Sequence, residues 1–383
     1  MVKNILFKLI DTKSYTGNEV DIVSTIKTLM EELGYDEIII DDAGNIIGAI
    51  HGSNEGATIL FDGHIDTVEA DNILEWHNQD PFKAYEKDGK IYGRGASDMK
   101  GAFAAMLYAL SQVDRQKLKG SLYISGTVNE EVAEGFTIRE VTKRIKPDLV
   151  VIGEATELKV NIGQRGRGEI SLTTYGKSAH SSNPDIGINA VLKMNKAISA
   201  ITDKYIPDED VLGKGILVLT DIISEPYPGE SVIPRRCKAT FDRRVILEET
   251  KESVIESLRN ILDPIKLEDK DFEYSIDYAK NDFITYKGYK IKGDKFYPPW
   301  KISEDSDLLK RISRSFAAED LDFKIGYYSF CTNGSSTCGI DEIETIGYGP
   351  GREVEAHITN EFIEVEQLMK AVRGYQALAY ILS

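Results

Sequence analysis

The sequence has few cysteines and no long apolar run. Its 383 residues include only Cys237, Cys331 and Cys338, and no two of them form a C-x-x-C pair. A disulfide scaffold needs more cysteines in an even number, so we expect a reducing compartment. No stretch approaches the roughly 18 consecutive apolar residues of a spanning helix, and lysines and an aspartate interrupt the N-terminal segment, which therefore lacks a secretory signal. We expect a cytoplasmic protein with no membrane segment.

The sequence also has fewer basic than acidic residues. The chain has 46 Lys and Arg residues against 63 Asp and Glu residues, a net charge of −17. This charge repels phosphate backbones and anionic lipid, so neither nucleic acid nor membrane is expected as a partner. Residues 286–297 (YKGYKIKGDKFY) interleave lysines with aromatics, as nucleic-acid stacking surfaces do. Because the rest of the chain is acidic, we interpret them as a solvated hairpin. The surplus of carboxylates suggests that some of them hold metal ions.

Up to about residue 155, strand and helix patterns alternate along the chain. One helical pattern begins near residue 20 and another covers residues 102–110. Apolar strands are predicted at residues 37–40, 46–50, 58–61, 121–127 and 148–152. Alternation of this kind requires crossover connections, and it predicts an α/β fold with a mainly parallel central sheet and helices on both faces.

The pattern changes after the glycine-rich joint Gly163-Gln-Arg-Gly-Arg-Gly168. The segments 168–175, 187–202, 215–223, 234–245, 250–262 and 271–279 are predicted as strand, helix, strand, strand, helix and strand. This is the order of a split βαβ, or ferredoxin-like, domain. After Pro298-Pro299 the helical and strand patterns of the first part return. We therefore expect a catalytic domain formed by residues 1–165 and 298–383, with an α+β domain of residues 166–297 inserted into it.

His64 is the first of five histidines to carry a chemical signal. It follows the strand at 58–61 in the segment Asp62-Gly-His-Ile-Asp66, and residues two apart in extended chain face the same side. A carboxylate beside a metal-bound imidazole fixes its tautomer and orientation. A buried pair with a purely structural role would have the same sequence.

Four acids stand close to the predicted strand ends or in a glycine loop before a helix. Asp98 lies in Gly93-Arg-Gly-Ala-Ser-Asp-Met-Lys-Gly101, Glu130 and Glu131 follow the strand at 121–127, and Glu154 follows the strand at 148–152. In open parallel sheets these ends meet at one edge, where ligands bind. Helix caps or solvated loop acids would explain any one of them. A whole cluster with no compensating Arg or Lys repels itself, however, and indicates bound cations.

These segments resemble the dinuclear zinc aminoacylase and carboxypeptidase family, which includes acetylornithine deacetylase, succinyl-diaminopimelate desuccinylase, carboxypeptidase G and dipeptidases. The resemblance covers essentially the whole chain. It is carried by SYTGNE at 14–19, GHIDTV at 63–68, GRGASDMKG at 93–101, the pair Glu130-Glu131, GKSAH at 176–180 and AHITNE at 356–361. Cys331 and the segment Gly166-Arg-Gly168 resemble a selenium-metabolism-linked branch of that family.

The resemblance implies a role for each residue of the cluster. One metal ion would be held by His64 and Glu154, and a second by Glu131 and His357, with Asp98 bridging both. Zinc is the expected metal, with cobalt or manganese as alternatives, since all three suit mixed imidazole and carboxylate ligands. Two further residues take part in the chemistry: Asp66 would orient His64, and Glu130 would act as general base and acid.

In the inserted domain the resemblance implies two further roles. His180 would enter the active site of the opposite subunit and stabilise the tetrahedral oxyanion, which implies a homodimer formed by the inserted domains. Arg244 occupies the position of a clamp for the substrate carboxylate, a role suited to bidentate Arg. An ordinary surface arginine beside Asp242 is the alternative.

The predicted function is metal-dependent hydrolysis of the amide bond of a small N-acyl amino acid or dipeptide, by a deacylase or dipeptidase type of enzyme. A nucleotide-binding P-loop and the G-x-S-x-G elbow of serine hydrolases are both absent from the sequence. The rival reading is a catalytically silent relative that binds metal or peptide. Its signature would be a missing ligand or base, and none is missing.

Overall fold

The structure is a computed structural model that describes residues 1–382, and the chain divides into two compact units. The large unit comprises Met1–Gln164, Asp282–Ile291 and the chain from Trp300 onward, and the small unit comprises Arg165–Asn281 and Lys292–Pro299. The predicted domain boundaries differ from this division mainly in residues 282–291, which were expected in the inserted domain. They also differ at residues 165, 298 and 299, which were expected in the catalytic domain and belong to the small unit.

Over the described residues, the central sheet of the large unit has nine strands in the order β1-β2-β6-β3-β7-β20-β8-β18, with β19 paired to β8. The four strands β6, β3, β7 and β20 run parallel at its centre, and antiparallel strands flank them. The bounds of the strands are β1 Glu37–Ile40, β2 Ile46–His51, β3 Asn54–His64, β6 Lys119–Thr127, β7 Leu149–Ile152, β8 Val160–Gln164, β18 Trp300–Lys301, β19 Ile325–Tyr328 and β20 Thr345–Gly347.

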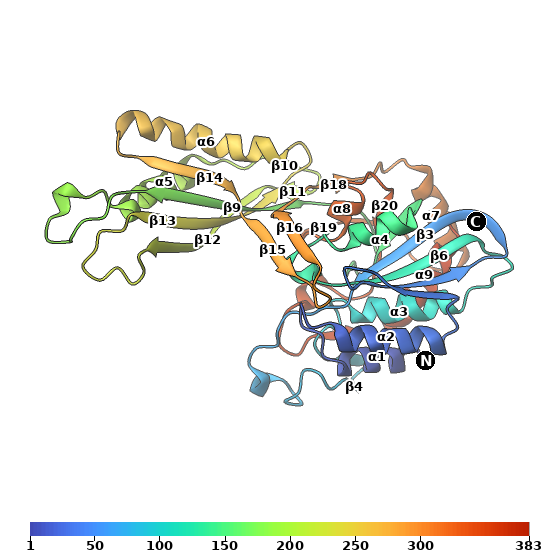
Figure 1. The fold of residues 1–383 in the computed structure, drawn as a ribbon. Coiled ribbons are helices and arrows are strands. Elements are labelled where there is room, and N and C mark those ends of the chain that lie inside the picture. Colours follow the sequence, from blue (N-terminus) through green and yellow to red (C-terminus); the bar gives the residue numbers. More distant parts are fainter. Residues whose placement is uncertain (383) are drawn as a thin grey trace. The chain divides into compact units, whose positions relative to one another are not determined.

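Helices cover both faces of this sheet because side chains that alternate along the strands enter two different cores. Ile59 and Phe61 of β3 belong to the main core, whereas Leu60 packs with Ile138 and Val141 of α4 on the opposite face. Figure 1 shows α1, α2 and α3 together on the face of the main core. The helices of this unit are α1 Val2–Asp11, α2 Val20–Glu32, α3 Lys100–Ser111, α4 Ile138–Ile145, α7 Asp307–Ala318, α8 Gly334–Thr337 and α9 Val365–Ala379. The predicted central sheet and its helical layers are confirmed.

The small unit contains an antiparallel sheet in the order β12-β13-β9-β14, with β17 paired to β9. In chain order its elements are strand, helix, strand, strand, helix and strand, as the sequence predicts for a ferredoxin-like domain. Both helices pack on one face of the sheet, over a separate core. The elements are β9 Gly166–Tyr175, α5 Ala190–Lys204, β12 Ile216–Glu225, β13 Arg236–Val245, α6 Lys251–Glu268, β14 Glu273–Tyr278 and β17 Phe296–Tyr297, with a short hairpin of β10 Glu209–Asp210 and β11 Gly213–Lys214.

The lysine- and tyrosine-rich segment forms a hairpin of β15 Lys280–Ile284 and β16 Lys290–Asp294. Its tip is not fully solvated, contrary to our prediction. The Tyr286 hydroxyl donates to the carbonyl of Gly44 at 2.9 Å, and Nζ of Lys287 donates to the carbonyl of Asp41 at 2.7 Å. These two side chains anchor the tip on the turn between β1 and β2, which is why residues 282–291 belong to the large unit.

A third sheet, of β4 Tyr85–Lys87, β5 Lys90–Tyr92 and β21 Phe362–Glu364, brings a segment near the C-terminus beside the loop that precedes α3. This pairing places residues 357–361 next to residues 93–98, a proximity that the site depends on. No helix within residues 1–382 combines the length and the apolar character needed to cross a membrane.

Candidate metal centre

His64 is the last residue of β3 and lies at the carboxyl end of the parallel strands. The register pairs His64 with Thr127 of β6 and Asp62 with Ile152 of β7, so the residues that follow those strands emerge beside it. Only 2% of His64 is exposed. Its Nδ1 lies 2.9 Å from the backbone carbonyl oxygen of Asp66. Because a carbonyl oxygen only accepts, Nδ1 donates, and the lone pair of Nε2 is left for a metal ion.

Asp66 orients two parts of the site by different atoms. Its carboxylate lies 3.7 Å from Nδ1 of His64, so the closer contact to that ring is the main-chain carbonyl. The carboxylate instead accepts the backbone N–H groups of Glu130 at 3.1 Å and Glu131 at 3.3 Å, together with the hydroxyl of Thr16 at 2.8 Å. The side chain of Asp66 therefore fixes the turn that carries the two glutamates.

Asp98 lies in the loop between β5 and α3 and faces two histidines at once. Its Oδ1 is 2.8 Å from Nε2 of His64, and its Oδ2 is 3.1 Å from Nε2 of His357. The two oxygens of one carboxylate thus point toward imidazoles that are 293 positions apart in the sequence. This is the arrangement required of a group that bridges two cations.

Glu130 and Glu131 stand in the short 3-10 turn η2 (Glu130–Val132) that follows β6. Asn129 enters this turn in the left-handed backbone region, at φ 57°, a conformation that Asn adopts more readily than most residues. Neighbouring side chains in such a turn point in different directions. Oε2 of Glu131 lies 3.1 Å from Nε2 of His357, whereas Glu130 approaches His64 and Glu154.

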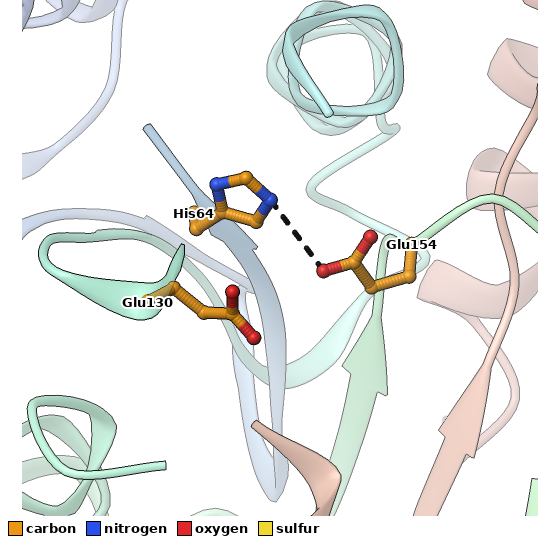
Figure 2. Close-up of side chains that lie close together, drawn as sticks. All are labelled: His64, Glu130 and Glu154. Carbon is orange, nitrogen blue, oxygen red and sulfur yellow. Dashed lines mark ion pairs between the residues drawn. The ribbon is translucent and has the colours of Figure 1, made fainter. Parts of the chain in front are cut away.

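Glu154 follows β7 and completes the cluster around His64. Its Oε1 lies 3.6 Å from Nε2 of His64. Figure 2 shows the side chains of His64, Glu130 and Glu154 approaching one another from three separate segments of the chain. Glu130 and Glu154 are 6% and 4% exposed, so both carboxylates are out of bulk water.

His357 lies just beyond η4 (Glu353–Glu355), with its backbone in the left-handed region at φ 61°. Its side chain is 51% exposed, unlike the other predicted ligands. The predicted metal ligands therefore converge on one edge of the large unit, with His357 on the solvent side. These ligands are His64, Asp98, Glu131, Glu154 and His357.

The protonation equilibria of the cluster are strongly perturbed. Burial raises the pKa of Glu154 to about 8 and that of Glu130 well above its usual range. Burial alone would also raise the pKa of Asp98, but the hydrogen bonds from His357 and His64 outweigh it and lower that pKa. The bonds to Asp98 and Glu131 raise the pKa of His357 to about 10. The cluster therefore attracts positive charge, in the form of protons or metal ions.

The residues present fit divalent metal ions. Candidate ligand atoms of His64, Glu130 and Glu154, and of His64, Asp98 and Glu131, lie within 4.8 Å of one another. Oε1 of Glu130 and Oε1 of Glu131 are buried and accept no hydrogen bond from the described residues. A buried carboxylate oxygen without a partner is costly unless a cation satisfies it. Imidazole and carboxylate donors together suit zinc, cobalt or manganese.

The other two predicted site residues lie in the small unit. The ring of His180 is exposed, and its Nδ1 is 2.8 Å from the hydroxyl of Ser182. Nε of Arg244 is 2.9 Å from Oδ1 of Asp242, whose other oxygen receives Nε of Arg167 at 3.0 Å. The metal cluster is formed by residues of the large unit, whereas His180 and Arg244 belong to the small unit. The roles of these two residues therefore stay predictions.

Sequence reasoning assigned no role to two buried acids that support the site. Glu19, the last residue of SYTGNE, accepts the N–H of Asn129 at 3.2 Å and therefore braces the turn ahead of Glu130. Glu361, the last residue of AHITNE, accepts the N–H of Asp98 at 3.0 Å. Both residues end segments that carry the family resemblance, and that was the one signal pointing to them.

The fold and the cluster define an α/β protein with a metal-binding centre and an inserted α+β unit. The chain belongs to peptidase family M20/M25/M40, whose profile matches residues 60–380. It is accordingly a hydrolase that acts on amide bonds, and the resemblance to the aminoacylase and carboxypeptidase family is confirmed.

Relatives and solved structures agree with this membership. The uncharacterised protein YgeY of Escherichia coli K12 is 32% identical, over 99% of this chain and 98% of YgeY. The acetylornithine deacetylase of Buchnera aphidicola subsp. Schizaphis graminum is 30% identical, over 82% of this chain and 78% of that protein. Among solved structures, aminopeptidase PepT from Bacillus cereus has a TM-score of 0.76 at 19% identity, covering 99% of this chain and 97% of PepT. The YXEP protein of Bacillus subtilis, described as a dinuclear metal binding peptidase, has a TM-score of 0.72 at 15% identity, covering 99% and 97%.

Proposed function

We propose that the chain is a dinuclear metallohydrolase that cleaves the amide bond of a small N-acyl amino acid or dipeptide. The observation that carries this proposal is the position of Asp98, whose two carboxylate oxygens each face a different histidine. In this proposal His64 and Glu154 hold one ion, Glu131 and His357 hold the other, and Asp98 is shared. Zinc is the proposed metal, with cobalt and manganese as alternatives.

When bound, the two ions supply Lewis acidity that polarises the scissile carbonyl and acidifies the attacking water. The chain itself supplies the proton transfer. Glu130 is buried beside His64, its Oε1 has no hydrogen-bond partner among the described residues, and burial raises its pKa well above the usual range. A carboxylate with a raised pKa can take a proton from water and later release it to the leaving amine nitrogen. We assign that role to Glu130.

The proposed roles in the small unit rest on the family resemblance and on surface properties. His180 is exposed and therefore free to meet another subunit, where it would stabilise the oxyanion. Arg244 would clamp the substrate carboxylate, although Asp242 competes for its guanidinium. The strand β12 exposes a row of apolar side chains, including Val218 at 51% and Ile223 at 51%. An exposed apolar strand of this kind supports the proposal of a homodimer formed through the small unit.

The relatives' names support the substrate class without fixing the substrate. One relative is an acetylornithine deacetylase and one structural neighbour is an aminopeptidase. An N-acyl amino acid and a dipeptide both present an amide bond near a free carboxylate, so both fit the proposed site. The silent-relative alternative has no observation in its favour, since all proposed ligands and the proposed base converge in the large unit.

The experiment that tests the function is a substrate panel. Chelator-stripped protein is reconstituted separately with zinc, cobalt and manganese, and each form is assayed against N-acetyl, N-succinyl and N-carbamoyl amino acids and against dipeptides. We expect metal-dependent hydrolysis of at least one substrate class, abolished by the chelator. Metal bound at full stoichiometry with no turnover on any member of the panel would favour the silent relative instead.

A further inference from the structure

Glu361 is a buried carboxylate of the large unit that is not among the proposed ligands. It is 0% exposed. Its Oε1 accepts the N–H groups of Ser97 at 2.8 Å and Asp98 at 3.0 Å, and its Oε2 accepts the N–H of Gly95 at 3.0 Å and Nη1 of Arg94 at 2.8 Å. A carboxylate offers about four acceptor positions, so these four donors occupy it. Glu361 therefore has no lone pair left for a metal ion.

The donors all belong to the loop that presents Asp98. Three of the four residues from Gly95 to Asp98 give their backbone N–H to one side chain, and Gly93 donates its N–H to the carbonyl of Glu361 at 3.0 Å. Gly95 takes a left-handed conformation at φ 85°, which lets the loop wrap around the carboxylate at little steric cost. The wrapped loop leaves the side chain of Asp98 directed at the two histidines.

The contacts between Arg94 and Glu361 also hold the loop that presents His357 in place. Glu361 is four residues beyond His357, and Nη1 of Arg94 also donates to the carbonyl of Ile358 at 3.4 Å. Next to it, Oδ1 of Asn360 accepts the N–H of His77 at 2.7 Å. The buried pair of Arg94 and Glu361 is thus the joint between the loop of Asp98 and the loop of His357.

Loss of this joint is expected to affect the ligands of one ion more than those of the other. Asp98 takes part in both proposed sites, but His357 takes part in only one. Since His357 is half exposed and its only ion-pair partners within 4.0 Å in the described chain are Asp98 and Glu131, its position depends on its loop rather than on packing around the ring. Loss of the joint displaces both Asp98 and His357 at that ion, whereas His64 and Glu154 stay anchored on β3 and after β7.

We propose that Glu361 is a positioning residue that sets Asp98 against His357 and thereby determines how tightly the ion between Asp98, Glu131 and His357 is held. The proposal rests on the proposed function, because it presumes two ions. Outer groups that orient metal ligands typically change affinity by about 10–100-fold when they are removed. Replacement of Glu361 by Gln removes the negative charge with little change of volume. The amide NH₂ group of Gln would face N–H donors of the Asp98 loop and could not accept from them, so the joint is broken.

The test measures metal affinity directly. Chelator-stripped wild type and Glu361→Gln are titrated with Zn²⁺ in competition with a chromophoric chelator. We expect wild type to bind two ions, and the variant to bind one ion as wild type does and the second about 10–100-fold more weakly. We also expect turnover of the variant to recover when Zn²⁺ is raised in proportion, which a loss of folded protein would not allow.

The control is Glu249→Gln in the small unit. Glu249 likewise pairs with a buried arginine, Arg243, and accepts a backbone N–H, that of Ile246 at 3.0 Å. We expect this variant to lose folding stability and to bind both ions as wild type does. Should Glu361→Gln fold poorly, Glu361→Asp keeps the charge but is one methylene too short to reach both Asp98 and Arg94, and it is expected to weaken the same ion.

The outcomes separate the inference from the function. If wild type binds two ions and both Glu361 variants bind them with unchanged affinity, Glu361 is only a stabilising residue and the inference is wrong. If wild type binds no ion, the proposed function itself fails. Equal weakening of both ions would also contradict the inference, because the joint would then not distinguish His357 from His64.

Discussion

The two largest sheets, the central sheet of the large unit and the antiparallel sheet of the small unit, differ in how completely helices cover them. The central sheet of the large unit has helices on both faces, and charged side chains at its strand ends are buried against one another. Both helices of the small unit pack on the same face of its sheet, and β12 leaves Val218, Ile222 and Ile223 about half exposed. The large unit assembles its cluster from its own residues, whereas the small unit exposes apolar side chains on β12. We infer that the large unit binds the metal and that the small unit contributes through contacts with another subunit.

The largest expected effect concerns the base in the large unit. Glu130→Gln keeps the shape of the side chain but cannot take a proton, and we expect kcat to fall by about 10²–10⁴-fold. Both metal ions should remain bound, as measured by elemental analysis of the purified variant. Loss of one ion would show that Glu130 is a ligand, as its closeness to His64 and Glu154 allows. Full activity would contradict its role as base.

The second effect tests whether the small unit contributes chemistry. His180→Ala is expected to lower kcat by about 10²–10³-fold, as the loss of one oxyanion donor does, with both metal ions retained. His51→Ala is the matched control, since His51 is also exposed and also contacts a serine, Ser121, at 2.9 Å. The control should keep wild-type kcat.

Mixing two inactive variants tests whether His180 acts across a dimer. Chains carrying His180→Ala and chains carrying Glu130→Gln, once unfolded and refolded together in equal amounts, should recover about a quarter of wild-type activity, because half of the dimers are mixed and each has one intact site. No recovery, with dimers present by light scattering, would place His180 in the site of its own chain or outside any site.

The smallest effect concerns the dependence of stability on pH in the metal-free protein. Burial raises the pKa of Glu154 to about 8 and that of Glu19 to about 7. Between about pH 4.5 and 7 these groups keep protons in the folded state that the unfolded chain has released, so the free energy of unfolding falls as the pH rises. In the small unit the hydrogen bond from Lys193 lowers the pKa of Asp269, a contribution that is lost only in stronger acid.

The measurement is urea denaturation with a chelator at pH 5 and at pH 7. We expect the metal-free large unit to be less stable at the higher pH and bound zinc to reverse the trend, because ligands must lose their protons to bind it. The buried Lys100, whose pKa burial lowers to about 7, opposes the trend only above that pH. Stability that rises from pH 5 to 7 without metal would contradict the assigned protonation of the cluster.

Much of the fold and the cluster could be predicted because each signal is local. The strand ends before His64, Glu130 and Glu154 are visible as apolar runs that stop at a charged residue, and parallel strands bring such ends together. The order of elements in the small unit is likewise a matter of sequence spacing.

The supporting contacts could not be predicted because they join residues far apart. Glu361 meets a loop 263 positions away, and Tyr286 meets Gly44 across 242 positions. Nothing in the local pattern around Glu361 or Tyr286 specifies the partner. The contact of Asp66 with His64 was expected through the carboxylate, and the choice between that group and the main-chain carbonyl depends on turn geometry that the H-x-D pattern leaves open.

The most direct test of the proposed centre is the number of metal ions that the large unit holds. Calorimetric titration of chelator-stripped protein with Zn²⁺, checked by elemental analysis, should give two ions per chain for wild type, and Asp98→Ala should lose the ability to hold the pair. A wild-type chain that takes up one ion or none, or an Asp98→Ala variant that still binds two with unchanged affinity, would contradict a centre in which this aspartate is shared.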